Sequence, residues 1–406
     1  MRAKSYAKIA IWTITALVTA FAAATHIACG TQGDIIGGTT AWPVSGTKPW
    51  AKLDLGDGVL ALLAPEGEVY LEPCLIKALG HHWIYFERRV VEAREDGLDY
   101  ATHSEILVAK GRNAFDYEIE YDGLPVLYPT QDWEGEFVGA PTILQREDNS
   151  LVMWYAGGVA AGIGRAISHD GGETWEKDDG PVMVADQKWE RGFVGAPSVI
   201  YHNHLFRMYY SGGEVTETST GQFAGRLIGY ADSPDGIHWT KRDHLGNNSK
   251  DDGNNVFYIM GPTQFWEGAD EVNPDPYIGG VNSPAALMTN QAGRNVLLLY
   301  YGGNLVGDPI LHEMSVGVAG AYDYNTFTKA PIIEMNPVVN QNFDLNLWGI
   351  SEYLGYSEYS PSVIQVTFDL FLMAFAQTDP LAELTGGSRG IGLAQNPPPR
   401  DAAAGG

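Results

Sequence analysis

Cysteine is scarce in this chain: only Cys29 and Cys74 occur among 406 residues, so at most one disulfide can form. Positive charge is scarce as well, because 25 lysine and arginine residues stand against 50 aspartate and glutamate residues, which gives a formal net charge of −25. A surface this acidic repels phosphate backbones and anionic lipid head groups, so we expect no nucleic-acid partner. The composition, 45% hydrophobic and 18% charged, excludes a disordered or collagen-like chain.

Long apolar runs are absent except at the N-terminus. There an apolar run from Ile9 to Ala24 follows basic residues at Arg2, Lys4 and Lys8, an arrangement typical of a secretory signal peptide. The run is short for a membrane span and no other stretch reaches spanning length, so we predict a mature chain without a transmembrane segment. We assign residues 1–28 to the signal peptide and the polar residues 29–49 to a flexible tether.

The segment before Cys29 decides how the chain is processed. Residues 26–28 resemble the cleavage signal of bacterial lipoproteins, although a small or aliphatic residue is usual where His26 stands. We therefore predict lipid attachment at Cys29 and a location outside the cytoplasm, at the cell envelope. Ordinary cleavage near residues 22–24, with secretion or release into the periplasm, is the alternative. A lipidated Cys29 leaves Cys74 as a small buried hydrophobe, and a disulfide between the two is the other option.

Glycine and aromatic residues are abundant, with 49 glycines, 21 tyrosines and 11 tryptophans, which favours tight turns and aromatic strands. One pattern recurs five times: a short strand around a proline, an aromatic strand that often ends in glycines, and a third apolar strand. The prolines are Pro73, Pro141, Pro197, Pro284 and Pro361. A sheet of three or four short strands cannot bury both faces alone, but a ring of such sheets can. The sequence therefore predicts an all-β fold, a five-bladed β-propeller over residues 50–396.

The two ends of this segment are expected to meet. The fifth repeat runs out after Leu393 and Ala394, because the prolines at 397–399 cannot continue a strand ladder. We predict that the N-terminal segment around Val59–Leu63 supplies the outer strand of the fifth blade and closes the ring. Residues 397–406 are then a disordered tail.

Turns and long segments indicate which face of the ring carries the function. The turns at Ser168–Trp175 and Ser233–Trp239 match the Asp-box pattern, in which Ser and Asp side chains bond turn amides, and we expect them to be structural. The long variable segments fall on the opposite face, where a rigid ring usually builds its binding site. Trp-Glu pairs lead into that face before the first strand of blades 2, 3 and 4, at Trp133-Glu134, Trp189-Glu190 and Trp266-Glu267. We expect this rim to stack on sugar rings, and wedging between blades is the alternative.

In its proline-containing first strands, aromatic second strands and Ser-x-Asp-Gly-x-x-Trp turn, the chain resembles the five-bladed propeller glycosidases over roughly residues 50–395. This superfamily includes the arabinanase, arabinofuranosidase and β-xylosidase group and the invertase and levansucrase group. Its members usually place carboxylates around the ring axis, so that two carboxyls flank the scissile bond. The resemblance implies Glu72, immediately before Pro73, as general base or nucleophile. Ala140 and Ala196 stand at the corresponding positions of blades 2 and 3.

Glu72 is the only acid that directly precedes one of these five prolines. Burial at the axis is expected to raise its pKa unless a cation such as Arg191 lies nearby. The structural alternative is that Glu72 bonds loop amides and closes the central tunnel. We predict Glu136, on the loop that leads into blade 2, as the catalytic partner of Glu72. The predicted substrate-binding residues are Trp133, Glu134, Trp189, Glu190, Arg191, Asn282 and Glu358.

No cofactor is expected. Asp251–Asn255 offers oxygen ligands that suit Ca²⁺, but a solvated acidic loop is the simpler interpretation, so no metal site is predicted. The resemblance implies a secreted or lipid-anchored glycoside hydrolase-like protein that acts on a poly- or oligosaccharide, with carbohydrate as its partner. The missing axial acids keep two alternatives open: a non-catalytic glycan-binding surface protein, and a propeller used as an interaction platform.

Overall fold

The computed structural model describes residues 50–53, 60–93, 99–158, 162–213, 216–217, 223–224, 226–243, 246, 258–267, 280–291, 293–304, 314–330, 357–378 and 389–397. All of them belong to one compact unit, Ser45–Gly406. The predicted signal peptide, the tether with Cys29, Asp251–Asn255 and the tail after Pro397 lie outside the described residues. Within the described ranges, no helix is long and apolar enough to cross a membrane.

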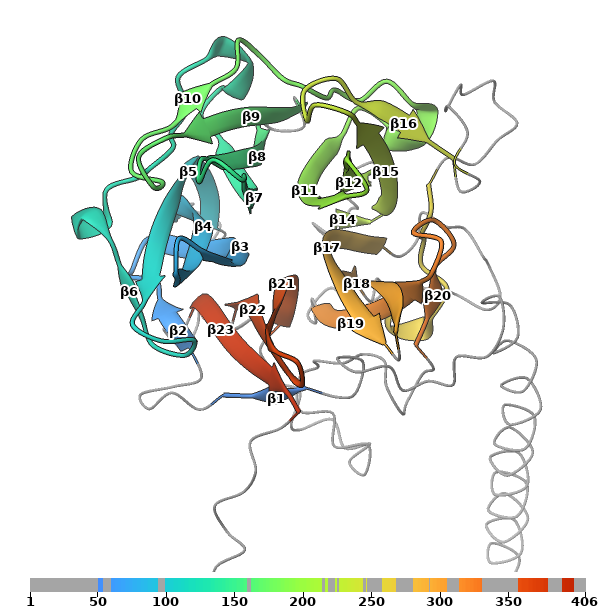
Figure 1. Ribbon diagram of the computed structural model, residues 1–406. Helices are drawn as coiled ribbons and strands as arrows, with labels where there is room; N and C mark the ends of the chain where they lie inside the picture. Colours follow the sequence, from blue (N-terminus) through green and yellow to red (C-terminus); the bar gives the residue numbers. More distant parts are fainter. Residues whose placement is uncertain are drawn as a thin grey trace, which may run out of the picture. The chain divides into compact units, whose positions relative to one another are not determined.

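The strands form five antiparallel blades arranged in a ring, with the first strand of each blade nearest the centre (Figure 1). Blade 1 contains β3 (Glu68–Ala78), β4 (His81–Ala93), β5 (Asp99–Gly111) and β6 (Tyr117–Ile119). Blade 2 contains β7 (Val138–Gln145), β8 (Leu151–Gly157), β9 (Gly162–Ser168) and β10 (Glu176–Lys177). Blade 3 contains β11 (Val194–His202), β12 (Leu205–Gly212), β15 (Leu227–Ser233) and β16 (Thr240–Arg242). Blade 4 contains β17 (Gly280–Gln291), β18 (Arg294–Asn304), β19 (Met314–Ala321) and β20 (Thr328–Lys329).

Short elements complete the connections. A two-stranded hairpin, β13 (Thr216–Glu217) with β14 (Phe223–Ala224), lies between β12 and β15 in the chain. Four 3-10 turns occur in the described ranges: η1 (Tyr121–Gly123), η2 (Asp132–Glu134), η3 (Lys188–Glu190) and η4 (Phe265–Glu267). The last three precede the first strands of blades 2, 3 and 4, so they repeat at one position of the ring.

The fifth blade joins the two ends of the propeller. Its own strands are β21 (Ser357–Thr367), β22 (Leu370–Thr378) and β23 (Arg389–Asn396). Two N-terminal strands, β1 (Ala51–Lys52) and β2 (Leu60–Leu63), pair antiparallel with β23. Leu62 is buried in an apolar cluster that includes Tyr70 of blade 1 and Ile391 of blade 5. The predicted five-bladed, all-β fold is therefore confirmed, as is its closure by an N-terminal strand.

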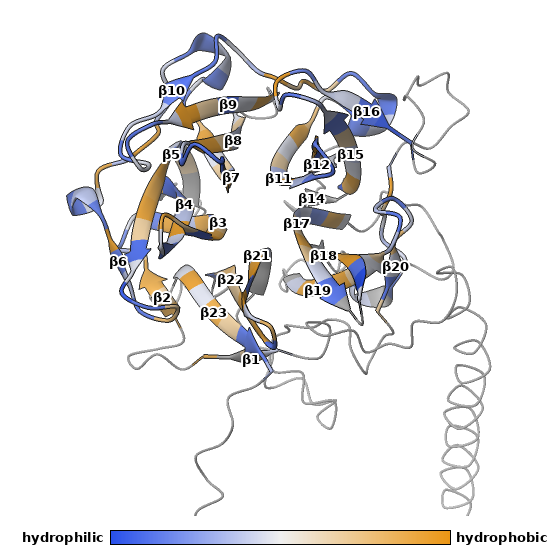
Figure 2. Ribbon diagram, viewed as in Figure 1, coloured by the Kyte–Doolittle hydropathy of each residue, from blue (hydrophilic) through white to orange (hydrophobic). Residues whose placement is uncertain are grey.

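Apolar side chains between neighbouring blades form the core. The second strand of every blade carries a fully buried aromatic residue, namely Tyr85, Trp154, Tyr209, Tyr300 and Phe375. Hydrophilic residues concentrate at the periphery, for example on β10 and β16 (Figure 2). Because burial of such side chains is worth about 1.5–3 kcal/mol each, the interfaces between blades are the main source of stability.

In blades 2, 3 and 4 the turn between the third and fourth strands packs against the blade before it. In blade 2 the Asp170 carboxylate accepts hydrogen bonds from the amides of Glu173 and Thr174, and Trp175 packs edge-on against Tyr85 of blade 1. The equivalent rings of blades 3 and 4, Trp239 and Phe327, pack edge-on against Trp154 and Tyr209. These turns therefore hold the ring together on the face where they lie.

Candidate active site at the propeller axis

Each first strand has one β-bulge at the point where it reaches the axis. The residue before the proline has a φ of 44–52°, in the left-handed region, in all five blades. These residues are Glu72, Ala140, Ala196, Ser283 and Ser360. Such a conformation is strained for a residue with a side chain, and a following proline restricts it further. Strain of this kind persists only where the surrounding structure imposes it, and it is concentrated at functional sites. The five bulges thus mark the axis as the candidate site.

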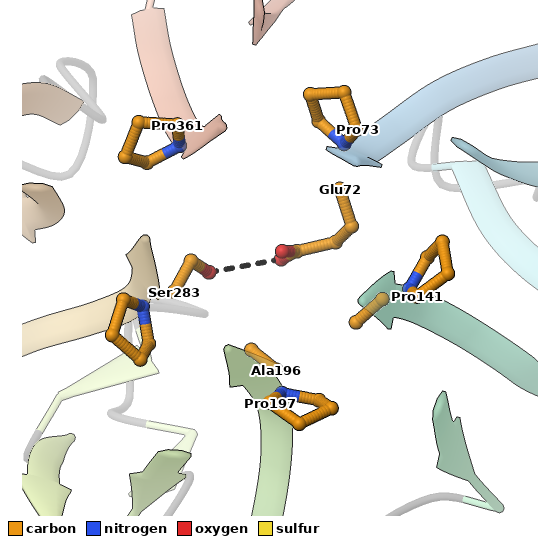
Figure 3. Close-up of a pocket in the computed structure, with 9 residues that line it drawn as sticks. Glu72, Pro73, Pro141, Ala196, Pro197, Ser283 and Pro361 are labelled. Carbon is orange, nitrogen blue, oxygen red and sulfur yellow. Dashed lines mark hydrogen bonds between the residues drawn. The ribbon is translucent and has the colours of Figure 1, made fainter. Parts of the chain in front are cut away.

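A small pocket, partly open to solvent, lies on the axis between these bulges, and its empty space of about 240 Å³ includes open solvent. Its described lining consists of Glu72, Pro73, Ala140, Pro141, Ala196, Pro197, Ser283, Pro284 and Pro361. In Figure 3 the prolines surround the space and the Glu72 side chain reaches across it toward Ser283. Among these lining residues only Glu72 has an ionisable side chain, so it is the one that can exchange a proton with a molecule in the pocket.

Glu72 is held by serines of blades 4 and 5. The Ser283 hydroxyl donates a hydrogen bond of 3.0 Å to its Oε1, and the Ser360 hydroxyl lies 3.3 Å from the Ser283 hydroxyl. Removal from water and the negative charge of Glu87 raise the pKa of Glu72, while hydrogen bonds from Ser360 and Ser283 and the charge of Arg226 oppose that rise. The net effect is a raised pKa, as expected from the sequence. The cation near Glu72 is Arg226, in place of Arg191.

A second carboxyl, Glu87, lies beside the pocket. It is on β4, opposite Leu71 in the strand register, and only 4% of the residue is exposed. Its carboxylate lies directly against Gly139 of blade 2, where an added Cβ would overlap it. Arg89 binds Glu87 Oε1 through Nε at 2.8 Å and through a terminal nitrogen at 2.6 Å. The buried Glu87 carboxylate of blade 1, whose charge Arg89 compensates, therefore lies at the axial end of blade 2, next to Ala140.

Glu87 is unusual for its position in the ring. The register places Ala156, Ser211, Gly302 and Ala376 at the equivalent positions of the other second strands. Glu87 was not predicted from the sequence. The available signal was the charged run Glu87-Arg88-Arg89 directly after the apolar residues of a strand that is otherwise buried. A charge inside such a strand needs a partner or a function.

Arg226 completes the axial cluster and was not predicted either. It lies just before β15, and its carbonyl accepts a hydrogen bond of 3.0 Å from the Val281 amide of blade 4. Its guanidinium stacks on Phe193, with Cζ 4.5 Å from the ring centroid. We call Glu72, Glu87, Arg89 and Arg226 the axial charge cluster. No pattern in the sequence marks Arg226, because it stands alone beside the variable segment 214–225.

The other predicted axial residues are spread out. Glu136 is exposed, and its carbonyl accepts a hydrogen bond from the Ser104 amide. Arg191 is exposed as well, at the end of η3. Asn282 is buried beside Ser283, with its side-chain oxygen against Gly302. The backbone of Glu358 pairs with Gln377 in blade 5, and the side chain of Glu358 lies outside the described part.

The Trp-Glu pairs predicted to bind substrate form a repeated internal unit. In blade 2, Glu134 is 0% exposed and accepts hydrogen bonds from the amides of Thr130 (2.7 Å) and Gln131 (3.0 Å), from the Tyr155 hydroxyl (2.7 Å) and from Lys177 Nζ (2.7 Å). The same contacts recur in blade 3 with Glu190, Tyr210 and Lys241, and in blade 4 with Glu267, Tyr301 and Lys329. We call these three sets the Trp-Glu units.

The tryptophans of the Trp-Glu units lie over glycines of the second strands. Trp133 covers Gly157, Trp189 covers Gly212, and Trp266 covers Gly303, each so closely that a Cβ on the glycine would overlap the indole. All three carboxylates are enclosed, and their hydrogen-bonding capacity is used inside the blade. The part in substrate binding predicted for Trp133, Glu134, Trp189 and Glu190 therefore has no geometric support. The wedging alternative describes the tryptophans better.

Metal-binding side chains are not gathered in the described part of the chain, where no group of three or more His, Cys, Asp or Glu residues could hold an ion. The Asp251–Asn255 segment lies outside that part. Cys74, the described cysteine, is a buried free thiol whose pKa is raised to about 12 by removal from water. It therefore stays protonated and packs as a small apolar side chain.

The fold defines a class, the five-bladed β-propellers. No protein-family model matches the chain, and no curated protein matches it in sequence. Solved structures do match. One, described as a complex of BT0996 with RGII, is 17% identical with a TM-score of 0.58, over 88% of this chain and 94% of the matched protein.

Two further structures name glycoside hydrolase families. One, described as "The GH130 family of mannoside phosphorylases contains glycoside hydrolases that target beta-1,2 mannosidic linkages in Candida mannan", is 14% identical with a TM-score of 0.57, over 88% of this chain and 96% of the matched protein. A thermostable family-43 glycoside hydrolase is 16% identical with a TM-score of 0.53, over 82% and 91%. The predicted resemblance is thus confirmed, and at these identities it establishes the fold alone.

Proposed function

We propose that this protein is a glycoside hydrolase that binds a poly- or oligosaccharide in the axial pocket and uses Glu72 and Glu87 for acid–base catalysis. The observation that carries the proposal is the pair of carboxyls at the axis, one in the pocket wall and the other beside it. Glycoside hydrolysis needs two carboxyls in different protonation states on the two sides of the scissile bond. The shared fold with glycoside hydrolases supports the same class of reaction.

The surroundings of the two carboxyls suggest their roles. Glu72 has a raised pKa and is a suitable proton donor to the glycosidic oxygen. Glu87 is paired with Arg89, which compensates its negative charge, and it is a suitable base for water or a stabiliser of the positive transition state. This assignment makes Glu72 the acid, where the resemblance implied a base or nucleophile. It also favours Glu87 over the exposed Glu136 as the partner.

Turnover of aryl glycosides by the purified mature chain tests the proposal. We expect Glu72→Gln and Glu87→Gln each to lower kcat by about a hundredfold or more, because each removes one arm of the proton transfer. Glu147→Gln, which changes an exposed acid in the turn between β7 and β8, is the matched control and should keep full turnover. Circular dichroism establishes that each variant is folded. Full activity of Glu72→Gln would refute the catalytic assignment, and loss of activity in Glu136→Gln but not Glu87→Gln would restore Glu136 as the partner.

One observation favours a second candidate, a non-catalytic glycan-binding protein. Small residues, Gly139-Ala140 and Gly195-Ala196, stand where the resemblance implies acids in blades 2 and 3. A polysaccharide panel scored separately for binding and for turnover distinguishes the two functions. Binding that survives Glu72→Gln, without turnover of any substrate, selects the binding protein. Neither binding nor turnover favours the interaction platform.

We also propose that the chain is exported and anchored through a lipid on Cys29. The support is the N-terminal sequence, in which the apolar run Ile9–Ala24 ends shortly before Cys29. Metabolic labelling with a radioactive fatty acid, followed by membrane fractionation, tests this for the full chain. The label should enter the wild type and be lost in Cys29→Ser, whereas a labelled Cys29→Ser protein would contradict the assignment.

A further inference from the structure

The axial charge cluster contains one guanidinium, that of Arg226, with a buried nitrogen that is unsatisfied among the described residues. The Nε of Arg226 is buried and meets no acceptor there. No ion pair joins Arg226 to a carboxylate of the described ranges, and its described contact is the face of Phe193. Leaving a buried donor unpaired costs free energy, and more for a charged group. An unsatisfied buried donor next to a pocket is a candidate contact for a ligand.

The charge balance around Arg226 depends on the protonation state of Glu72. Burial lowers the pKa of Arg226, the charge of Glu72 opposes that effect, and the charge of Arg89 adds to it. Arg89 itself is engaged by Glu87 at 2.6 Å. Glu72 is bonded on its far side by Ser283. When Glu72 carries a proton, the state that its proposed role as the acid requires, the axial charge cluster has one positive charge in excess beside a pocket that is open to solvent.

The geometry suits an anion more than a neutral ligand. A guanidinium presents a planar fork of donors that matches the two oxygens of a carboxylate or a sulfate. Contact with the face of Phe193, 4.5 Å from Cζ to the ring centroid, restricts the Arg226 side chain before a ligand arrives, which lowers the entropy lost on binding. Because the whole protein is strongly acidic, this local positive site is not a consequence of overall charge.

We propose that Arg226 binds an oxyanion carried by the sugar in the axial pocket, so that the protein selects acidic saccharides, with a carboxylate or a sulfate, over their neutral counterparts. This inference rests on the proposed function and names its substrate class. Arg226 is the anion-binding residue, Phe193 positions it, and Arg89 adds positive potential while it holds Glu87. Inorganic phosphate is included in the test, because it is also an oxyanion that a guanidinium can bind.

Isothermal titration of the mature chain with matched sugars tests the inference. The pairs are methyl glucuronide against methyl glucoside and methyl galacturonide against methyl galactoside, with glucose 6-sulfate and inorganic phosphate as further anions. We expect each acidic sugar to bind about 10–100-fold more tightly than its neutral partner, the range that a charge-assisted hydrogen bond of about 1.5–3 kcal/mol supplies. The uronate and sulfate arms show which oxyanion fits, and inorganic phosphate shows whether the sugar is needed at all.

Variants connect the preference to Arg226. Arg226→Gln should reduce the preference to less than about twofold, and Arg226→Lys, which keeps the charge but loses the fork, should retain an intermediate preference. Arg146→Gln removes the same charge from an exposed position in the turn between β7 and β8 and should leave the preference intact. If Arg226→Gln does not fold, Arg226→Lys and Phe193→Leu provide the comparison, and both should weaken the preference.

Several results would overturn the inference. Equal binding of acidic and neutral sugars would show that Arg226 binds no oxyanion. A preference for acidic sugars that persists in Arg226→Gln would show the same. Tight binding of inorganic phosphate with no preference among sugars would also exclude an acidic-saccharide site. Binding or turnover of neutral glycans only would overturn this inference while the proposed function stands. Failure to bind or cleave any saccharide would overturn both.

Discussion

The Trp-Glu unit of blade 2 allows a sharp test of what holds the blades together. The perturbation is Glu134→Gln, which keeps the shape of the side chain and removes its charge. Glu134 accepts hydrogen bonds from two backbone amides, one hydroxyl and Lys177, and it is fully enclosed. Glutamine has one acceptor oxygen instead of two, so its amide group must face either the two backbone amides or the Tyr155 hydroxyl and Lys177.

The magnitude follows from the loss of a buried partner. Removing one member of a buried ion pair costs about 3–5 kcal/mol, because the other charge stays buried without compensation. Lys177 is that charge, with 10% of its side chain exposed. An unfolding entropy of about 2 cal/mol/K per residue, over a unit of about 350 residues, converts this loss into a fall in Tm of about 4–7 °C.

Thermal denaturation followed by circular dichroism measures the effect, with Glu136→Gln as the matched control. Glu136 is two residues away, is exposed, and should change Tm by less than about 1 °C. The effect also depends on pH. Burial by itself raises the pKa of Glu134, but hydrogen bonds from Lys177, the Thr130 and Gln131 amides and Tyr155 outweigh it, so the pKa is lowered. The stability that Glu134 contributes is therefore present above the unfolded pKa and is lost as pH falls through the folded one.

The result that would refute this reasoning is equal stability of Glu134→Gln and the wild type at pH 7, with normal unfolding of the control. It would mean that Lys177 finds another partner or reaches water. The double variant Glu134→Gln/Lys177→Met separates these cases. If the pair is coupled as described, the double variant should be more stable than Glu134→Gln, because no uncompensated charge remains.

Three further predictions concern the closure and the axis. Leu62→Asp places a charge in the cluster between blades 1 and 5 and should lower Tm sharply or abolish cooperative unfolding. Leu63→Asp is the control, because Leu63 is 62% exposed, and it should not have this effect. Equal melting of the two variants would contradict closure of the ring by β2. Glu72→Gln should be at least as stable as the wild type at pH 7, because the raised pKa of Glu72 in the folded state makes its ionisation costly. The difference in stability should vanish toward pH 4, where the wild-type carboxyl is protonated in both states. A Glu72→Gln protein that is less stable than the wild type at pH 7 would contradict the raised pKa. Gly139→Ala should destabilise the protein by about 1–3 kcal/mol, because the added Cβ overlaps the Glu87 carboxylate. Glu87→Ala in the same chain should relieve this destabilisation. Urea unfolding measures both effects, and additive effects of the two substitutions would show that residues 139 and 87 do not touch.

The repeats could be predicted from the sequence because each blade is a local structure. The proline of the first strand, the aromatic second strand and the turn residues lie within a few dozen positions of one another, and their pattern recurs from Pro73 to Pro361. Glu72 was found for the same reason, since it directly precedes one of the repeated prolines. Closure by Leu60–Leu63 followed from a strand that the fifth repeat lacked.

The Trp-Glu pairs show where local reasoning stops. Their recurrence was visible in the sequence, but whether Glu134 faces a ligand or the interior depends on Lys177, 43 residues further along the chain. Nothing near Glu134 indicates that lysine. Only the antiparallel pairing of β10 with β9 brings it beneath the η2 turn. An enclosed carboxylate and a solvent-facing one have the same local sequence.

The axial charge cluster was decided by the tertiary structure. Glu87 meets Gly139 because strand 2 of one blade faces strand 1 of the next, and Arg226 approaches Glu72 because blades 1 and 3 converge on one axis. The sequence by itself determined the number of blades, the closure of the ring and the one acid that precedes an axial proline, because short-range patterns encode them. Which charges surround that acid depends on where the ring brings distant strands together, and short-range patterns carry no record of that.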